Sequence, residues 1–179
     1  MFSPPASSRV PHDEDSGFLE RTVAEHEASL IRYATRLLDD PDRARDVVQD
    51  TMVKLMAEPR ESINGHTVEW LFTVCRNRAL DVLRKEGRMR RFTPGEAEQV
   101  TSNDARPGRA LERFETQATV LKLVDALPPN QQEVVRLKFQ NGFSYKEISR
   151  ITNLSVTNVG FLIHTAVARL RAEFAARRP

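Results

Sequence analysis

The stretch from Gly142 to Leu170 constrains the fold of this chain most, because it reads as two helices joined by a tight turn. Ser144 and Glu147 have the spacing of a capping box, in which each side chain satisfies a free backbone N–H near the other residue. Gly142 can adopt the left-handed conformation that ends a preceding helix. A second helix is expected to begin after a cap at Ser155. The pattern predicts a helix-turn-helix.

The second helix of this pair has one apolar face and one uncharged, largely polar face. The apolar residues recur at helical spacing, and they are Val159, Ile163, Ala166, Val167 and Leu170. The opposite face carries Thr157, Asn158, Phe161, His164 and Thr165. A helix-turn-helix can lay its second helix in the major groove of DNA. The plainer alternative is a helical hairpin within a bundle.

Composition excludes several classes of protein. The chain has 179 residues, which is room for one domain or two small ones. Its net charge of +2 is too small to predict a nucleic-acid partner by itself. Cys75 is the single cysteine, so neither an internal disulfide nor a cysteine-based zinc framework is possible. It is expected to be a buried small apolar residue.

Motifs that carry chemistry are missing from the sequence. There is no glycine-rich phosphate loop, no His-Glu metal box and no recognisable Ser/His/Asp spacing. We therefore expect no enzyme activity, no cofactor and no metal. No signal peptide and no membrane-spanning run is visible. We therefore expect a cytoplasmic location and no membrane insertion.

The chain is predicted to be all-α, with two small helical domains joined by a flexible linker. Residues 1–17 are rich in serine, proline and charge, and are expected to form a disordered tail. The first domain is predicted to span residues 18–91, with a loop over 58–67 between its second and third helices. Residues 92–109, with prolines and glycines and little apolar periodicity, form the linker. The second domain, residues 110–176, contains the helix-turn-helix.

Three polar surfaces of the first domain are candidates for binding. Asp46, Gln49 and Asp50 share one helix face, which by default is merely solvated. Trp70 lies among basic and amide residues, a setting that suits stacking on unpaired bases; its alternative is a partly buried anchor. Residues 84–91 are dense in arginine and lysine, which suits phosphate contacts. The alternative there is a solvated helix end.

The chain resembles the extracytoplasmic-function sigma factors, two-domain initiation factors of bacterial transcription. The resembling segments are Tyr33–Leu38 with Ala44–Thr51, Trp70–Asp81 with Leu83–Lys85, and Leu127–Leu137 with Gly142–Ser149. In that order they look like the family's polymerase-binding helices, the helix that opens the minus-ten promoter element, and the domain that binds the minus-thirty-five element.

The resemblance implies roles for particular residues. Asp46, Gln49 and Asp50 match positions that contact the coiled coil of the largest subunit of core RNA polymerase. The loop over residues 61–67 corresponds to the family's specificity loop. The positions that match contacts to the minus-ten DNA, or that support its pocket for an unpaired base, are Trp70, Arg76, Asn77, Asp81, Arg84, Lys85 and Arg88.

The predicted recognition helix departs from the family. Members commonly carry lysine or arginine where this chain has Gly160, Leu162 and Thr165, and no basic residue occurs between residues 151 and 168. Gly160 is costly inside a helix, and the close approach of a backbone would be a reason to tolerate it. Flanking charge is expected from Lys146, Arg150, Arg169 and Arg171.

Bases are then expected to be read by uncharged side chains. The candidates for minus-thirty-five DNA are Lys146, Thr157, Asn158, Phe161, His164, Thr165 and Arg169, with Phe161 against a thymine methyl group. The alternative is that Phe161 and Leu162 bind a protein such as an anti-sigma factor. The resemblance thus implies a sigma factor whose partners are core RNA polymerase and promoter DNA, with an anti-sigma factor as a further candidate partner. The second interpretation is a stand-alone helix-turn-helix regulator.

Overall fold

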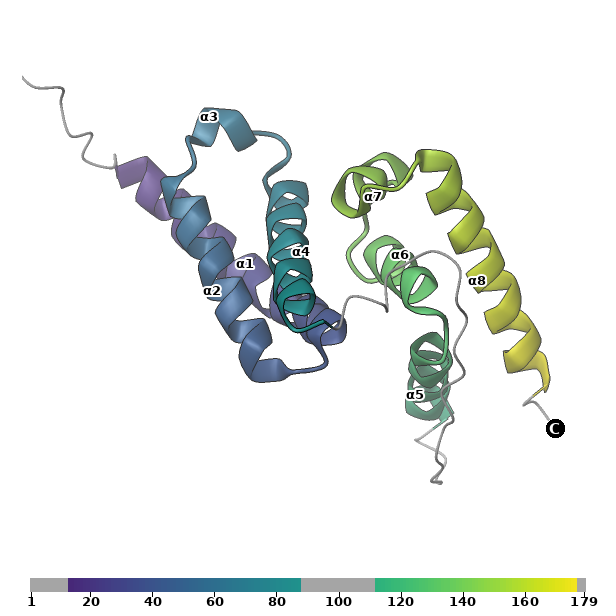
Figure 1. Ribbon diagram of the computed structural model, residues 1–179. Helices are drawn as coiled ribbons and strands as arrows, with labels where there is room; N and C mark the ends of the chain where they lie inside the picture. The colour runs from purple at the N-terminus through teal and green to yellow at the C-terminus, as the bar shows by residue number, and fades with distance from the viewer. Residues whose placement is uncertain (1–12, 88–111, 177–179) are drawn as a thin grey trace, which may run out of the picture. The chain divides into compact units, whose positions relative to one another are not determined.

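The computed structural model describes residues 13–87 and 112–176. Within these two ranges the chain forms eight helices and no strand (Figure 1). The contacts divide it into two compact units, residues 1–82 and 83–179. The predicted all-α fold with two helical domains is therefore confirmed. The predicted linker over residues 92–109, together with Arg88, lies outside the described residues.

The division between the units falls inside a helix rather than after residue 91, where the sequence placed it. The helix in question, α4, runs without a break from Thr67 to Lys85. Most of α4, up to Val82, belongs to the first unit.

The first unit consists of α1 (Asp13–Leu38), α2 (Pro41–Ala57), α3 (Arg60–Ile63) and α4 (Figure 1). Asp40 caps α2 by accepting hydrogen bonds from the backbone N–H groups of Asp42 and Arg43. The two-residue connection makes α1 and α2 close neighbours. α4 packs on this pair through large side chains, and the ring of Phe72 lies 5.1 Å from that of Tyr33, centroid to centroid.

Two elements of the first unit differ from expectation. α1 begins at Asp13, not at residue 18, so the predicted disordered tail is wrong for its last five residues. The tail was assigned from its content of serine, proline and charge, but Gly17 costs a helix only about 1 kcal/mol, too little to end one of this length. The predicted loop over 58–67 contains α3, a single turn. Its one buried anchor, Ile63, is too little for an apolar periodicity to show.

The second unit consists of α5 (Glu112–Asp125), α6 (Pro129–Phe139), α7 (Tyr145–Thr152) and α8 (Val156–Ala176). α8 runs past the other three helices and contacts each of them (Figure 1). The side-chain amide of Gln132 closes the turn between α5 and α6 by donating to the carbonyls of Asp125 and Leu127, at 2.6 and 2.8 Å. Most buried side chains of the helix-turn-helix are aliphatic, and they include Ile148, Ile151, Val159 and Ile163.

The caps that define the helix-turn-helix are confirmed. The Ser144 hydroxyl accepts from the N–H of Glu147 at 3.3 Å, and the Glu147 carboxylate accepts from the N–H of Ser144 at 2.6 Å. Hydrogen bonds of its carboxylate with the side chain and the backbone of Ser144 hold the pKa of Glu147 below its usual value. Gly142 has a φ of +76°. Asn153 ends α7 in the left-handed region, and α7 and α8 meet with a bend of 106°, within the range of helix-turn-helix units.

Among the described residues, none of the helices alone is long and apolar enough to cross a membrane; α7 and α8 meet that length and composition test only together, as a bent pair.

Candidate nucleic-acid interface

The predicted polymerase-binding residues all lie on the exposed side of α2. Asp46, Gln49 and Asp50 point outward. The inward positions of the helix are taken by small and branched residues, namely Ala44, Val47, Val48, Thr51 and Leu55. An amphipathic helix that buries this stripe must leave the acidic face in water.

Asp50 differs from its two neighbours because it reaches another helix. Its carboxylate accepts from Nε and Nη2 of Arg78 on α4, at 2.8 and 2.6 Å. Both side chains remain partly exposed, at 39% for Arg78 and 49% for Asp50. Asp50 therefore ties α4 to α2, in addition to any contact it makes with a partner.

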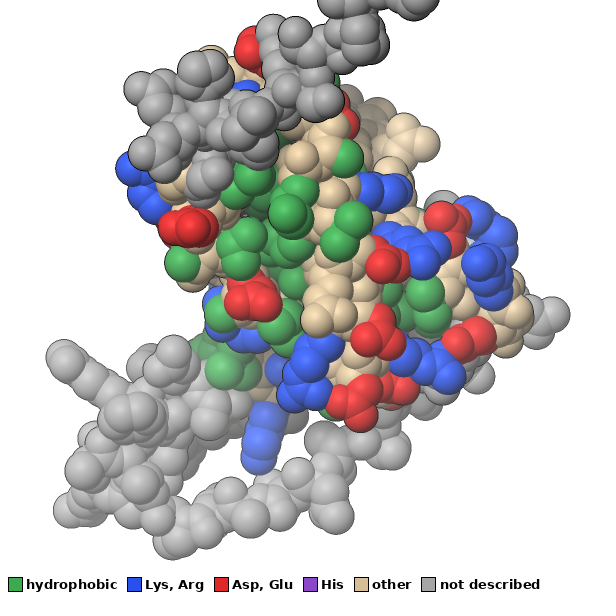
Figure 2. Space-filling model, turned by 90° about the vertical axis from the view of Figure 1, so that its left-hand side faces the viewer, with side chains coloured by type: hydrophobic (Ala, Val, Ile, Leu, Met, Phe, Trp, Pro, Cys, Tyr) green, Lys and Arg blue, Asp and Glu red, His purple; other side chains and the backbone are tan. Residues whose placement is uncertain are grey.

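Two residues of the α2 face were missed by the sequence reasoning. Val53 and Met56 are 64% and 70% exposed, and they are the large apolar side chains that the first unit leaves most open among its described residues. Their spacing of seven and ten residues from Asp46 continues the same face. Apolar side chains also group between charged ones on the side of the molecule shown in Figure 2. The spacing was the signal in the sequence that could have found both residues.

The α4 helix carries the predicted minus-ten residues. One face of α4 is defined by four of them. Asn77, Asp81 and Arg84 follow Trp70 by seven, eleven and fourteen residues, which is helical spacing. Asn77 and Arg84 are exposed, whereas Trp70 and Asp81 are half-buried. This face therefore combines an amide, a partly anchored indole and a basic end.

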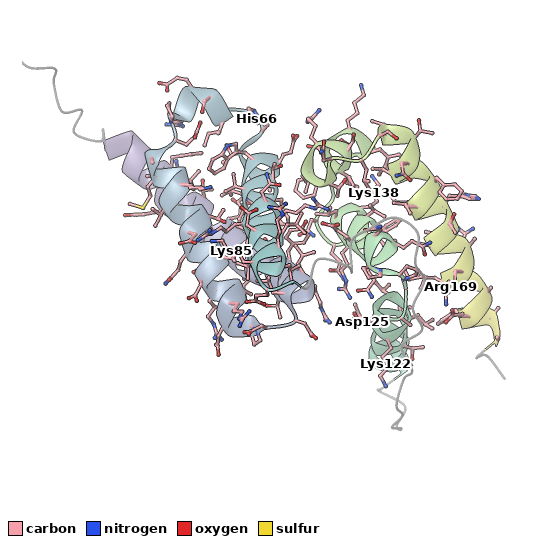
Figure 3. The ribbon with its side chains drawn as sticks, viewed as in Figure 1. His66, Lys85, Lys122, Asp125, Lys138 and Arg169 are labelled. Atoms are coloured by element: carbon pink, nitrogen blue, oxygen red, sulfur yellow. The ribbon has the colours of Figure 1, made fainter. Side chains whose placement is uncertain are left out.

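The remaining minus-ten candidates are placed differently. Arg76 is only 9% exposed, so it presents little surface to a nucleic acid. Lys85 is exposed in the last turn of α4, where basic residues are also favoured by the helix dipole (Figure 3). His66 stands exposed just before α4, and its Nδ1 is 3.3 Å from the Asn64 carbonyl.

The exposed side of α8 is an uncharged stripe, which we define as Thr157, Phe161 and His164. All three are exposed, and Phe161 is 65% so. Asn158 and Thr165 flank the stripe and are half-buried. The stripe is opposite Val159 and Ile163, which are buried against the other helices of the unit.

Positive charge lies beside this stripe rather than on it. Lys146 and Arg150 are exposed on α7. Arg169, farther along α8, donates from Nε to Glu173 at 3.0 Å, so part of its charge is offset locally. All three remain candidates for phosphate contacts.

The reason expected for Gly160 is wrong. No backbone lies against it: a Cβ there would meet atoms of the Tyr145 ring at 3.6 and 3.8 Å, which is ordinary contact distance. The same ring has the Lys138 ammonium 5.5 Å from its centroid, on α6 (Figure 3). The packing of the unit therefore does not require a glycine at this position.

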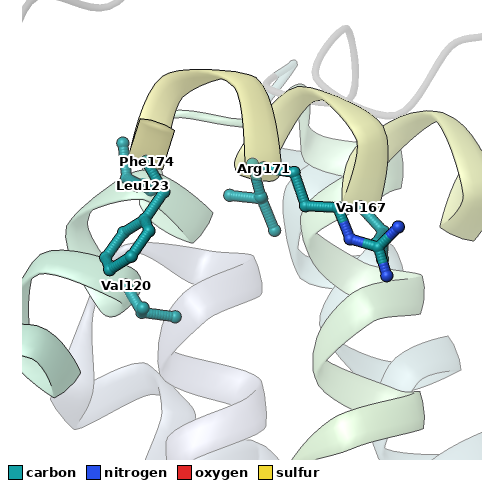
Figure 4. Close-up of a pocket in the computed structure, with 6 residues that line it drawn as sticks. Val120, Leu123, Val167, Arg171 and Phe174 are labelled. Carbon is teal, nitrogen blue, oxygen red and sulfur yellow. The ribbon is translucent and has the colours of Figure 1, made fainter. Parts of the chain in front are cut away.

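The described residues show a cavity of about 210 Å³ between α5 and α8, and no cluster of metal ligands (Figure 4). Its lining is apolar apart from one side chain, and comprises Val120, Leu123, Val167, Leu170, Arg171 and Phe174. This lining holds no pair of groups that could act as acid and base.

Fold and surfaces together define a helical protein with a helix-turn-helix unit and a second unit of a different kind. The family model described as sigma-70 region 2 matches residues 22–89, and sigma-70, region 4 matches residues 117–170. SigL of Mycobacterium tuberculosis, an extracytoplasmic-function (ECF) RNA polymerase sigma factor, is 32% identical over 167 residues, covering 88% of this chain and 89% of SigL. The chain belongs to the ECF sigma factors.

Other relatives agree with this assignment. SigE of Mycolicibacterium smegmatis is 27% identical over 153 residues, which cover 85% of this chain and 60% of SigE. The sigma factor RpoE of Bartonella quintana, solved in complex with the anti-sigma factor NepR, matches with a TM-score of 0.61 and 25% identity over 90% of this chain and 99% of RpoE. The chain is thus an RNA polymerase sigma factor for promoter recognition. A stand-alone helix-turn-helix regulator would leave the region 2 match unexplained.

Proposed function

We propose that the exposed faces of α2, α4 and α8 divide the work of initiation among three contacts. One observation carries this proposal: two faces of opposite chemistry lie on one compact unit. The α2 face formed by Asp46, Gln49, Asp50, Val53 and Met56 is acidic and apolar, with Arg43, Arg45 and Lys54 exposed beside it, whereas α4 exposes an amide and basic side chains. An acidic face repels nucleic acid and suits a protein partner, while a basic face suits phosphates.

The α2 face is the proposed contact with core RNA polymerase, at the coiled coil of its largest subunit. Asp46 and Gln49 supply charge and hydrogen bonds, and Val53 and Met56 supply apolar area that a partner can bury. Interfaces of this composition gain affinity from the apolar centre and orientation from the polar residues. Asp50 serves this face mainly by fixing α4 beside it.

The α4 face is the proposed contact with the minus-ten element. Melting requires that an unpaired base be held outside the stack, which costs a few kcal/mol. Trp70 and Asn77 offer a stacking surface and hydrogen bonds to a base edge, with Arg84 and Lys85 exposed on the same helix for the phosphates. Asp81 is half-buried on this face, and Arg76 supports it from below.

The helix-turn-helix is the proposed contact with the minus-thirty-five element. The uncharged stripe would face base edges, and Lys146 and Arg150 would contact phosphates beside them. Asn158, Thr165 and Arg169 are the other proposed contacts of this helix. No catalytic step is proposed, and the protein would act where the polymerase acts, inside the cell.

Because the related RpoE is solved with an anti-sigma factor, regulation by such a protein is also proposed for this chain.

Run-off transcription with core polymerase and a pool of the host's promoter fragments tests this proposal. Wild-type protein should yield specific transcripts. Asp46→Arg should weaken polymerase binding by about a hundredfold or more, because a reversed charge in an interface costs several kcal/mol. Glu27→Arg, a charge reversal at an exposed site on α1, is the matched control and should bind as wild type does. Polymerase binding by Asp46→Arg at wild-type strength would contradict the assignment of α2.

A further inference from the structure

Phe161 is the most exposed large apolar side chain of α8, and its place on the helix matters more than its exposure. Phe139, on α6, is 63% exposed, close to the 65% of Phe161, so exposure alone assigns no role. Phe161, however, stands between Thr157 and His164 on the stripe that turns away from the buried face. It makes no contribution to the core and is available to a partner of α8.

The charge around Phe161 indicates what that partner is. Residues 140–173 contain four basic residues and two acidic residues, a net charge of +2. The acids are Glu147, whose carboxylate is held in the capping box by Ser144, and Glu173, which pairs with Arg169. Lys146 and Arg150 are exposed on α7. An uncharged stripe with cations beside it complements a groove between phosphate backbones.

The chemistry of base edges indicates which group of a base Phe161 would contact. In the major groove every base edge offers hydrogen-bond donors or acceptors, and the C5-methyl of thymine is the apolar group. An apolar ring has no hydrogen bond to give, so its favourable counterpart is that methyl group. Thr157 and His164, four residues before and three after, can bond the neighbouring polar edges.

We propose that Phe161 is a specificity-determining residue that selects thymine in the minus-thirty-five element by contact with its C5-methyl group. The proposal rests on the proposed function of α8. It differs from that function in a testable way, because deoxyuridine keeps every hydrogen-bonding group of thymine and lacks the methyl group.

The experiment uses holoenzyme, assembled from core polymerase and the full chain, on a promoter recovered from the run-off pool. Two templates are synthesised that differ only upstream of the minus-ten element, where one has thymine and the other deoxyuridine. Loss of one buried methyl contact should lower wild-type promoter affinity by about fourfold on the deoxyuridine template. Initial transcription at limiting holoenzyme should fall by the same factor.

Phe161→Ala and Phe139→Ala are the paired variants. Phe161→Ala should bind the thymine template more weakly and should no longer distinguish the two templates. Phe139→Ala, a change of the same side chain at nearly the same exposure, should keep the fourfold preference for thymine. Circular dichroism of both variants checks that the helices are retained.

Equal activity of the wild type on both templates overturns the proposal. It is also overturned if Phe161→Ala keeps the preference for thymine, or if it transcribes both templates as well as the wild type does; the last result would leave Phe161 to a protein partner. If the wild type yields no transcripts from any template, the proposed function itself fails, which is a separate outcome.

Discussion

The helices α4 and α8 are both proposed to face promoter DNA, yet their units hold them by different means. α4 lies on α1 and α2 through long side chains, with Phe72 against Tyr33 and Arg78 against Asp50. α8 is held by close packing of small and branched residues such as Ala166, and it makes contacts along the whole unit.

The exposed faces differ in the same way. α4 ends in basic residues, whereas α8 presents an uncharged stripe, with positive charge on α7 and toward the C-terminal end of α8. In the proposed contacts, attraction to phosphates and reading of bases therefore come from different surfaces of the second unit. Salt should weaken the proposed contacts of α4 more than those of α8, because each phosphate contact releases counterions.

The largest expected effect is on the ring pair that anchors α4. Phe72 is 1% exposed, so Phe72→Ala should destabilise the first unit by about 3–5 kcal/mol. Hydrogen exchange resolved by helix should show faster opening of α1, α2 and α4. Phe139→Ala, at an exposed site, should change stability by no more than about 0.5 kcal/mol. If hydrogen exchange in α5–α8 were accelerated equally, the two units would unfold as one cooperative body rather than separately.

A second, smaller effect concerns the cap of the helix-turn-helix. Ser144→Ala should cost the second unit about 1 kcal/mol. The lowered pKa of Glu147 adds a pH dependence: its stabilisation is present above the usual carboxyl pKa of 4.5 and is lost as the pH falls through the lowered value. Acid titration of unfolding should show a smaller loss in Ser144→Ala than in wild type. An identical acid limb in both proteins would mean that the cap does not set this dependence.

The glycine of α8 should respond in the opposite direction. Gly160→Ala is expected to stabilise the second unit by about 0.5–1 kcal/mol, because the added methyl group meets the Tyr145 ring at ordinary contact distance. Gly142→Ala is the contrasting change, since its φ of +76° strains any residue with a Cβ, and it should destabilise. Thermal unfolding of the two variants measures both changes in stability. If Gly160→Ala were destabilising, the packing against α8 at this position would be tighter than the structure shows.

The smallest expected effect belongs to the ion pair between α2 and α4. A double-mutant cycle with Asp50→Asn and Arg78→Gln should give a coupling of about 0.2–1 kcal/mol, because both side chains are partly exposed. Added salt should reduce it further. A coupling well above this range would mean that charge, rather than apolar packing, holds α4 in place.

Local features of the sequence predicted much of this structure. The caps at Asp40 and Ser144 and the left-handed Gly142 depend on residues within a few positions of one another, so spacing was enough. The partnership of Asp50 with Arg78 was beyond reach because 28 residues separate them, and only the packing of α2 against α4 brings them together.

Burial was harder to predict than helix position. Arg76 looked like its exposed neighbour Asn77 in the sequence, yet only 9% of it is open to solvent. Val53 and Met56 were assigned to neither face of their helix, and they face outward. In each case the result depends on how one helix is rotated toward its neighbours, which a helical period fixes only to within a residue or two.

Cys75 makes the opening of the first unit measurable by thiol labelling. It is the only thiol in the chain, it is fully buried, and burial raises its pKa to about 12. A thiol reagent attacks the thiolate, so the native protein should be inert until the unit opens. The rate of labelling then reports how often the first unit opens. No engineered probe is needed, and the second unit contributes no signal because it has no cysteine.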